Sequence, residues 1–245
     1  MRNLRLKLSF DGAAYHGWQI QSNAVTVQGT VEEAVKKIFG SHLTVYGCSR
    51  TDSGVHANEY FCNFKTENSA IPAENAVKAL NGILPPDIAV LQCNEAAPEF
   101  HSRYDCKSKE YIYKIWNSSI KNPFFANRAY QYKYKLDEVN LNEAAKSYIG
   151  TYDWSAFCAS GSSVKSTVRT VINAEVLRQG DFVIFKVEAD GFLYNMVRIM
   201  VGTLIYVNEG KIDKSSIKDI ILSGDRDNAG FTAPPEGLYL NRVEY

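Results

Sequence analysis

The sequence predicts an α+β protein with two split-βαβ halves and mostly antiparallel sheets. The length of 245 residues is enough for one large domain or two small ones. A hydrophobic fraction of 45% and a charged fraction of 22% are ordinary for a globular protein. Alternating and helical apolar patterns follow one another along the first half in the order β-α-β-β-α-β. The second half is again a series of strands and helices, with larger elements.

The first half contains two amphipathic helices. One begins after Thr26, which can cap it, and ends at Gly40. The other begins at Pro72 and runs to about residue 83, ahead of the Pro85 pair. Strands are expected at residues 4–10, 43–46, 56–65 and 88–92.

The second half has larger elements of the same kinds. Helices are expected at residues 136–149, 192–208 and 215–222, the second with a single apolar face. Strands are expected at residues 109–116, 129–135, 167–177, 181–189 and 237–243. With a junction near Tyr104, the predicted domains are residues 1–104 and 105–245.

The sequence excludes several classes of protein. Five scattered cysteines without a C-x-x-C pair favour reduced thiols in a cytoplasmic protein over a disulfide framework or a zinc site. The N-terminus alternates charged and apolar residues, which is typical of a strand and not of a signal peptide. The most apolar later stretch contains Asn195, Arg198 and Gly202, so no membrane span is expected.

Positive charge is concentrated in one segment, although the formal net charge is zero. Residues 101–135 hold eight lysines and arginines against two acidic residues, a local balance of plus six, together with nine aromatic residues. Such a segment can contact phosphates and stack bases. It can also be a half-buried strand with solvated lysines, and this signal taken alone favours the strand.

The turn G-C-S-R-T-D-S-G-V-H-A, residues 47–57, places one carboxylate between two predicted strands. Asp52 follows Arg50 by two residues and precedes Gly54 by two. Asp and Gly are common turn residues, so a bare D-x-G has a purely structural explanation. A glycine here would also let the backbone turn tightly enough for the carboxylate to project into a cleft.

Five further stretches accompany this turn, and together they carry a resemblance. They are F-D-G-A-A-Y-H-G-W-Q from Phe10, F-H-S-R-Y from Phe100, K-E-Y-I-Y-K-I from Lys109, F-L-Y-N-M-V-R from Phe192 and E-G-L-Y-L from Glu236. The six motifs, in this order and over nearly the whole chain, resemble the bacterial tRNA pseudouridine synthase A family.

The resemblance implies a tRNA-uridine isomerase. Such an enzyme breaks the N-glycosidic bond of a uridine, turns the uracil and rejoins C5 to the same sugar carbon, at positions 38, 39 and 40 of the anticodon stem-loop. It implies two halves of ferredoxin-like or RRM-like type that flank a central RNA-binding cleft, a homodimer, and no metal or cofactor. The absence of a phosphate-cradling G-x-x-x-x-G-K motif and of a metal-ligand cluster fits this expectation.

The resemblance also assigns roles to four residues. Asp52 matches the nucleophilic aspartate, and Arg198 matches the arginine that pairs with it, which would keep the carboxylate ionised. Arg50 matches a residue that contacts the RNA. Tyr111 matches the tyrosine that lies on the extracted uracil. Tyr113 has the same strand parity, so one of the two tyrosines could belong only to the core.

The sequence departs from the common family form in two places, and two alternative functions remain possible. Ser49 and Ser53 stand where many members carry Gly and Ala, and N-E-Y-F-C-N-F after Ala57 replaces a smaller continuation, which puts the substrate range in question. An N-glycosidase that releases uracil would need a second carboxylate or base, and Glu59 lies seven residues on. A non-catalytic RNA-binding module would explain the aromatic residues but not the Asp52 motif.

Overall fold

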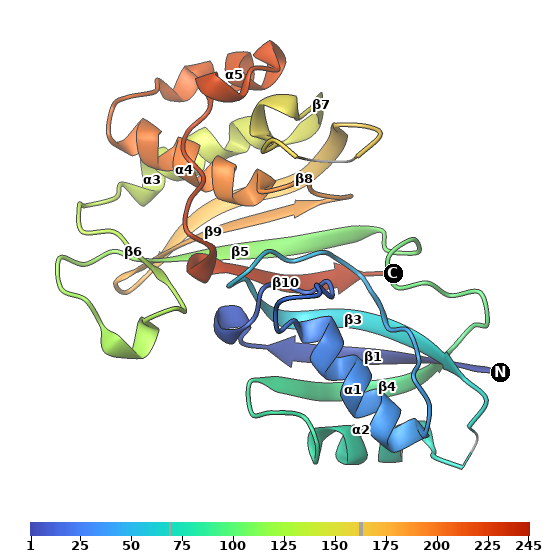
Figure 1. Cartoon of the computed structure of the whole chain (residues 1–245). Coiled ribbons are helices and arrows are strands. Elements are labelled where there is room, and N and C mark those ends of the chain that lie inside the picture. The colour runs from blue at the N-terminus through green and yellow to red at the C-terminus, as the bar shows by residue number, and fades with distance from the viewer. Residues whose placement is uncertain (69, 162–163) are drawn as a thin grey trace. The chain divides into compact units, whose positions relative to one another are not determined.

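A computed structural model of the chain describes residues 1–68, 70–161 and 164–245. It forms two compact units, one of Met1–Lys107 with Tyr239–Tyr245 and one of Ser108–Leu238. Both combine helices with mostly antiparallel strands, which confirms the predicted fold class (Figure 1). The last strand belongs with the first unit, whereas the boundary expected from sequence assigned it to the second.

The first unit is built on a sheet with β1 at its centre. Antiparallel neighbours flank β1 on both sides, with Leu6 opposite Cys62 of one and Cys93 of the other. This gives the order β4-β1-β3, which β2 and the parallel β10 extend at β3. The strands are β1 (Arg2–Phe10), β2 (Tyr46–Gly47), β3 (His56–Thr66), β4 (Ile88–Ala96) and β10 (Leu238–Glu244).

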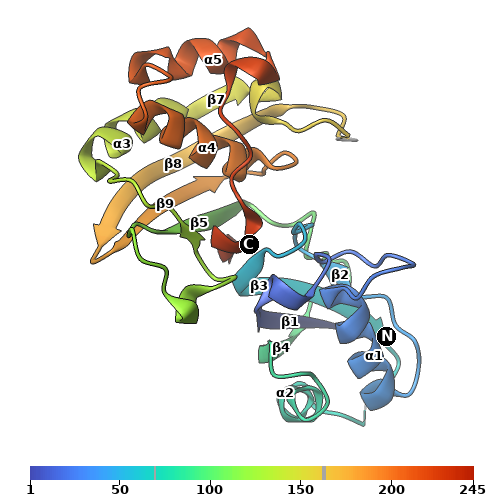
Figure 2. The ribbon, with the colours of Figure 1, turned by 60° about the vertical axis from the view of Figure 1, so that its left-hand side comes forward.

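Two helices cover one face of this sheet, as Figures 1 and 2 show. Helix α1 (Val27–Phe39) begins as predicted, because the Thr26 side chain accepts a hydrogen bond from the Gly29 amide, and it ends at a left-handed Gly40. Helix α2 spans Ala73–Asn81. The core is formed by every second side chain of β1 and β3 and by apolar residues of α1, among them Leu4, Leu6, Leu8, Tyr60, Cys62, Phe64, Val31 and Val35.

A buried amide pair fixes the loop after β4. Asn63 is fully buried, and its Nδ2 donates to Asn3 Oδ1 over 3.0 Å, while its Oδ1 accepts from the Ser102 amide over 2.9 Å. The Nδ2 of Asn3 in turn donates to the carbonyls of Ala97 and Phe100, each at 2.9 Å. The two side chains thus take the place of a strand partner for the loop that carries the F-H-S-R-Y motif.

We expect Asn63→Ala to lower the free energy of unfolding by about 2 kcal/mol, because the Ser102 amide would be left buried without its acceptor. Urea unfolding followed by circular dichroism measures the loss. Asn58→Ala is the matched control, since Asn58 is an exposed asparagine of the same strand whose Nδ2 bonds Asn241 and should change stability by less than about 0.5 kcal/mol. Equal losses in both variants would contradict the role assigned to Asn63.

The second unit has a four-stranded antiparallel sheet of order β5-β9-β8-β7, with the short β6 parallel to β5. Tyr111 of β5 lies opposite Val187 of β9, which in turn lies opposite Ala174 of β8. The strands are β5 (Ser108–Trp116), β6 (Tyr130–Gln131), β7 (Gly150–Asp153), β8 (Val168–Gln179) and β9 (Phe182–Ala189). The sequence pattern did not reveal β7, whose four residues carry too little alternation.

Helices α3 (Glu138–Ala145) and α4 (Met196–Asn208) lie over one face of this sheet in Figures 1 and 2, and the shorter α5 (Ile217–Ser223) lies beyond them. Tyr148, Trp154 and Phe157 form a fully buried aromatic cluster in this layer. Helix α4 is buried almost all round and not on one face, because it is packed on several sides at once. It begins at Met196, four residues later than predicted, because Asn195 adopts a left-handed conformation at its N-cap.

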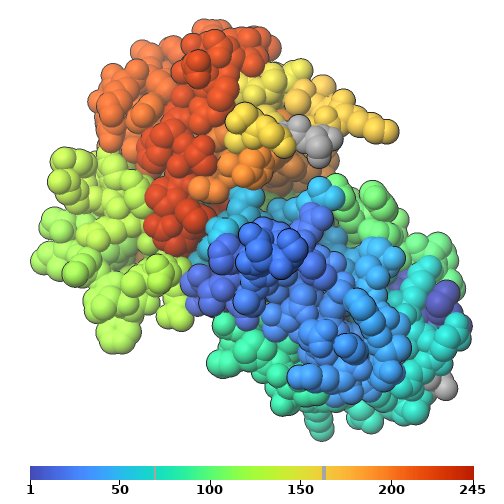
Figure 3. All heavy atoms as spheres, viewed as in Figure 1, coloured from blue at the N-terminus to red at the C-terminus, as the bar shows by residue number. Residues whose placement is uncertain are grey.

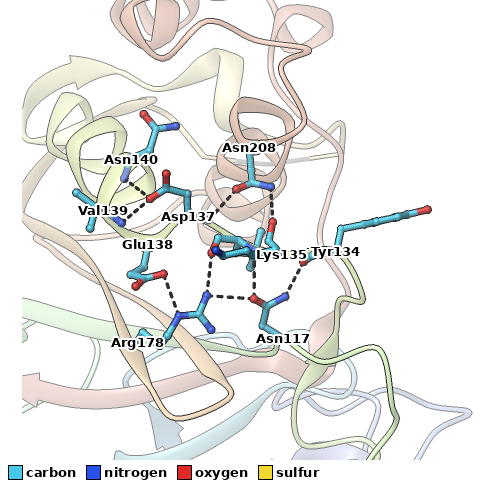
Figure 4. A network of polar contacts seen from close by, with 10 residues as sticks. Asn117, Tyr134, Lys135, Asp137, Glu138, Val139, Asn140, Arg178 and Asn208 are labelled. Atoms are coloured by element: carbon cyan, nitrogen blue, oxygen red, sulfur yellow. Dashed lines mark hydrogen bonds and ion pairs between the residues drawn. The ribbon is translucent and has the colours of Figure 1, made fainter.

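The strand predicted at residues 129–135 is wrong beyond Tyr130–Gln131. Its carbonyls are satisfied by side chains in place of a strand neighbour. Asn117 Nδ2 donates to the Tyr132 carbonyl over 3.0 Å. It also donates to that of Tyr134 over 2.6 Å, and Asn208 Nδ2 donates to that of Lys135 over 3.0 Å (Figure 4). The strand predicted at residues 43–46 is likewise reduced to Tyr46–Gly47.

The cysteines form no disulfide among the described residues. Cys48, Cys62 and Cys93 are buried, and burial raises the pKa of the Cys93 thiol to about 11 and that of Cys62 well above its ordinary value. In the part of the chain that the structure describes, no helix is long and apolar enough to cross a membrane.

Candidate active site

The turn that carries Asp52 is held by the loop from the F-D-G-A-A-Y-H-G-W-Q motif. The Trp18 amide donates to the Thr51 carbonyl over 3.1 Å, and the Gly54 amide donates to the Tyr15 carbonyl over 3.2 Å. Within the turn, the Val55 amide donates to the Asp52 carbonyl over 3.2 Å. Backbone hydrogen bonds therefore fix both sides of Asp52, whose side chain is half-buried.

Glycines allow the two loops to approach this closely. A Cβ on Gly12 would lie 1.9 Å from the Val55 carbonyl oxygen, and one on Gly17 would lie 2.4 Å from that of Thr51. Gly17 and Gly54 also have φ values of 82° and 78°, which side chains resist. The sequence indicated the need for Gly54, whereas the contacts of Gly12 and Gly17 depend on a neighbouring loop that it does not reveal.

His56 joins a third motif to the same place. Its ring is buried and stacks on Tyr239 of the E-G-L-Y-L motif, with ring centres 4.5 Å apart. The Gly12 amide donates to its Nδ1 over 3.1 Å, and Asp11 Oδ1 lies 3.1 Å from that atom. Three motifs far apart in the sequence thus meet within the first unit, and the contacts of His56 are those of a residue that fixes their packing.

Arg50 lies on the same turn as Asp52 and is exposed. Among the described residues, no hydrogen bond or ion pair of its guanidinium is found, so the group is available to a ligand in solution. A guanidinium can bond phosphate oxygens in pairs and stack on a base, which suits contact with RNA.

Tyr111 and Arg198 belong to the second unit. Tyr111 is buried on β5, with its ring 5.0 Å from that of Phe192 at a nearly perpendicular angle. Tyr113, two residues on, is fully buried, and its hydroxyl donates to the Pro234 carbonyl over 2.7 Å. Burial also raises the pKa of Tyr113. Tyr113 is therefore a core residue of this unit.

Two hydrogen bonds fix the orientation of Arg198 in the first turn of α4. Its Nε donates to the Ala233 carbonyl over 2.7 Å, and an Nη donates to Asn195 Oδ1 over 2.7 Å. The Ala233 amide donates back to the Arg198 carbonyl over 3.1 Å. Arg50 and Asp52 thus share one turn of the first unit, and Tyr111 and Arg198 share the second unit, each held by its local structure.

In the basic, aromatic segment, the part after β5 is largely exposed, whereas β5 itself consists of buried and half-buried residues. Lys121, Arg128, Lys133 and Lys135 are exposed, and burial lowers the pKa of Lys114, one of the two half-buried lysines of β5. In Figure 3 the part after β5 (yellow-green) lies at the surface of the second unit. The network of Figure 4 holds its last residues in place, because Arg178 bonds Asn117, Glu138 and the Leu136 carbonyl. The part after β5 is therefore mainly a fixed surface loop, while the β5 part is the half-buried strand that the sequence also allowed.

No group of three or more histidines, cysteines or acidic residues that could hold a metal ion occurs in the described ranges.

The comparisons with known proteins agree on a family. The sequence model of the tRNA pseudouridine synthase family matches residues 8–105 and 144–245. The "tRNA pseudouridine synthase A" of Thermoanaerobacter sp. (strain X514) is 49% identical over 245 residues, which is 100% of both chains. The protein of the same name from Clostridium acetobutylicum is 48% identical, again over 100% of both. The chain belongs to the tRNA pseudouridine synthase family and is an isomerase.

Solved structures are much more distant. A chain of a Cbf5-Nop10-Gar1 complex is similar over 96% of this chain and 57% of its own length, at 13% identity and a TM-score of 0.39. So distant a likeness adds nothing to the family assignment.

Proposed function

We propose that this enzyme converts uridine to pseudouridine on the 3′ side of the tRNA anticodon stem-loop, at positions 38, 39 and 40, and works as a cytoplasmic homodimer. Asp52 is the nucleophile of the proposed reaction. The observation that carries the proposal is the Asp52 turn, with its half-buried carboxylate and its backbone bonded to the Tyr15 and Trp18 loop on both sides. A fixed carboxylate can approach the sugar carbon of a nucleotide in one geometry.

In this mechanism the bond between N1 and C1′ breaks while the Asp52 carboxylate attacks the sugar. The uracil turns, C5 bonds to C1′ as the bond between C1′ and the Asp52 carboxylate breaks, and the proton leaves C5 while N1 gains one, so that product and substrate are isomers and Asp52 is regenerated. No metal or cofactor takes part in the proposed steps. Because a target uridine must leave its stack, Tyr111 supplies an aromatic face to the uracil, and Arg50 contacts the RNA beside it.

Arg198 is proposed as the partner of Asp52. A guanidinium beside a carboxylate keeps it ionised and oriented, which a nucleophile requires. The bonds of Arg198 to Ala233 and Asn195 support this role, because they restrict the guanidinium to one direction before any ligand is bound.

The departures from the common family form are accommodated within the first unit. The hydroxyl of Ser53 donates to the Tyr15 carbonyl over 3.3 Å, and Ser49 is bonded through its backbone to the Tyr60 hydroxyl. The N-E-Y-F-C-N-F continuation is the start and middle of β3, where Tyr60 stacks on Trp18. Although Ser53 and Asn58 are exposed, the contacts of the Ser49, Ser53 and Tyr60 positions lie within the first unit, which supports a substrate range like that of the family.

Mapping of pseudouridine in an unmodified tRNA transcript tests the proposal. We expect modification only at uridines of positions 38 to 40, and none in a matched transcript with cytidine at those positions. Modification confined to other positions would overturn the assigned specificity. Release of free uracil without pseudouridine would instead identify an N-glycosidase.

A further inference from the structure

Two exposed aromatic side chains of the first unit lie against one histidine. Tyr46 and Tyr104 are 42% and 74% exposed, and they are the exposed aromatic residues among the described part of this unit. The His101 ring lies close to both, 5.0 Å from Tyr46 and 4.4 Å from Tyr104, centre to centre. Exposed aromatic residues without a binding role have no reason to lie close together. The contact of both tyrosines with the same histidine therefore indicates a binding surface.

The backbone around this histidine is ordered by short-range hydrogen bonds. The amides of Tyr104 and Asp105 both donate to the His101 carbonyl over 3.1 Å, and the His101 amide donates to Asp105 Oδ2 over 2.8 Å. The Arg103 amide donates to His101 Nδ1 over 3.1 Å, which makes Nδ1 an acceptor and assigns the proton of the neutral ring to Nε2. The ring plane is therefore set before any ligand arrives.

The surface also carries a positive charge. The guanidinium carbon of Arg103 lies 5.8 Å from the centre of the Tyr104 ring. Arg103 and Lys107 are exposed, against Asp105 as the one acidic residue between them. Exposed rings beside an arginine are the combination that binds unpaired nucleotides, because a base stacks on the ring and the cation bonds its phosphate.

The chain itself limits how far this surface lies from the Asp52 turn. Tyr46 precedes Asp52 by six residues. A fully extended chain of six residues spans at most about 20 Å, so the Cα atoms of Tyr46 and Asp52 lie within that distance. A few nucleotides of an unpaired strand are long enough to span this distance, so one RNA can reach both the Asp52 turn and this surface.

We propose that Tyr46, His101 and Tyr104, with Arg103, form a stacking platform for an unpaired nucleotide of the tRNA substrate. This inference rests on the proposed function, since it concerns the same RNA. The base lies on the exposed Tyr104 ring, His101 packs against that ring and Tyr46 packs against His101, and Arg103 bonds the adjacent phosphate.

Steady-state kinetics of Tyr104→Ala and Tyr46→Ala on the tRNA transcript test the platform. We expect KM to rise about tenfold in Tyr104→Ala, the effect of losing one base stack, and less in Tyr46→Ala. The kcat at saturating tRNA should be unchanged, because neither ring touches the reacting atoms. Tyr104→Phe keeps the aromatic face and should retain the wild-type KM.

Leu91→Ala is the matched control, since Leu91 is a 50% exposed apolar residue of β4 outside the platform, and its KM should not change. If KM in Tyr104→Ala stays within twofold of wild type, the platform is overturned. An altered oligomeric state of Tyr104→Ala at unchanged KM would also overturn it, by assigning the rings to a protein contact. Inactive wild-type protein would refute the proposed function itself, whereas active wild type with an unaffected Tyr104→Ala would refute only the platform.

Discussion

Asp52→Asn is expected to abolish pseudouridine formation, with a fall in the single-turnover rate of at least about 1000-fold, or about 4 kcal/mol in activation free energy. Asparagine has the same shape but a far weaker nucleophile, so the step at the sugar carbon is lost while the turn is kept. The hydrogen bonds that hold the turn come from backbone atoms of Thr51, Asp52 and Gly54, which the substitution leaves in place. The measurement is tritium release from a C5-labelled transcript under excess enzyme.

The matched control is Glu59→Gln, which removes the next carboxylate after Asp52 along the sequence. Glu59 lies on β3 with its Oε2 2.5 Å from Lys7 Nζ, in a partly exposed ion pair that contributes at most about 1 kcal/mol to stability. Its activity should equal that of wild type. Wild-type activity in Asp52→Asn, from a preparation free of host enzyme, would remove Asp52 from the mechanism. Inactivity in Glu59→Gln would instead indicate a reaction that uses two carboxylates.

Local sequence signals predicted the elements whose ends are set by local chemistry. Helix α1 runs from its Thr26 cap to the left-handed Gly40 as expected, because a side-chain acceptor and a glycine determine its limits within a few residues. The segment at residues 129–135 has strand-like alternation, yet its carbonyls bond Asn117 and Asn208. Those partners lie 15 to 73 residues away in the sequence, so the local pattern does not predict them.

The candidate site shows the same division. Turn chemistry in the sequence predicts the turn that carries Asp52 and Gly54, since such signals are local, whereas the role expected of Asp52 comes from the family resemblance. The sequence leaves Tyr111 and Tyr113 equivalent by strand parity. The structure separates them, because the Tyr113 hydroxyl bonds the Pro234 carbonyl and its ring packs against Gly237. Close backbone approaches, such as Gly12 against Val55, depend on tertiary contacts and appear only in three dimensions.

Gly202→Ala is expected to lower the free energy of unfolding by about 3 kcal/mol, although helix propensity alone predicts a gain of about 0.5–1 kcal/mol for alanine inside a helix. A Cβ on Gly202 would lie 1.8 Å from the Phe231 carbonyl oxygen. The partner is backbone, so it cannot turn aside as a side chain could. The chain between α5 and β10 runs beside α4 in Figure 1, and the new methyl group would force them apart.

The same displacement should reduce activity through Arg198. The Gly230 amide bonds Thr203 Oγ1 over 2.8 Å, and the Ala233 carbonyl accepts from Arg198 Nε over 2.7 Å, on either side of the Gly202 contact.

Gly82→Ala serves as the control, because Gly82 has a φ of −71° and its Cβ would meet nothing closer than 3.5 Å. That variant should gain about 0.4–1 kcal/mol. Urea unfolding of both distinguishes the two explanations, since a Gly202→Ala protein as stable as wild type would mean that helix propensity outweighs the backbone contact.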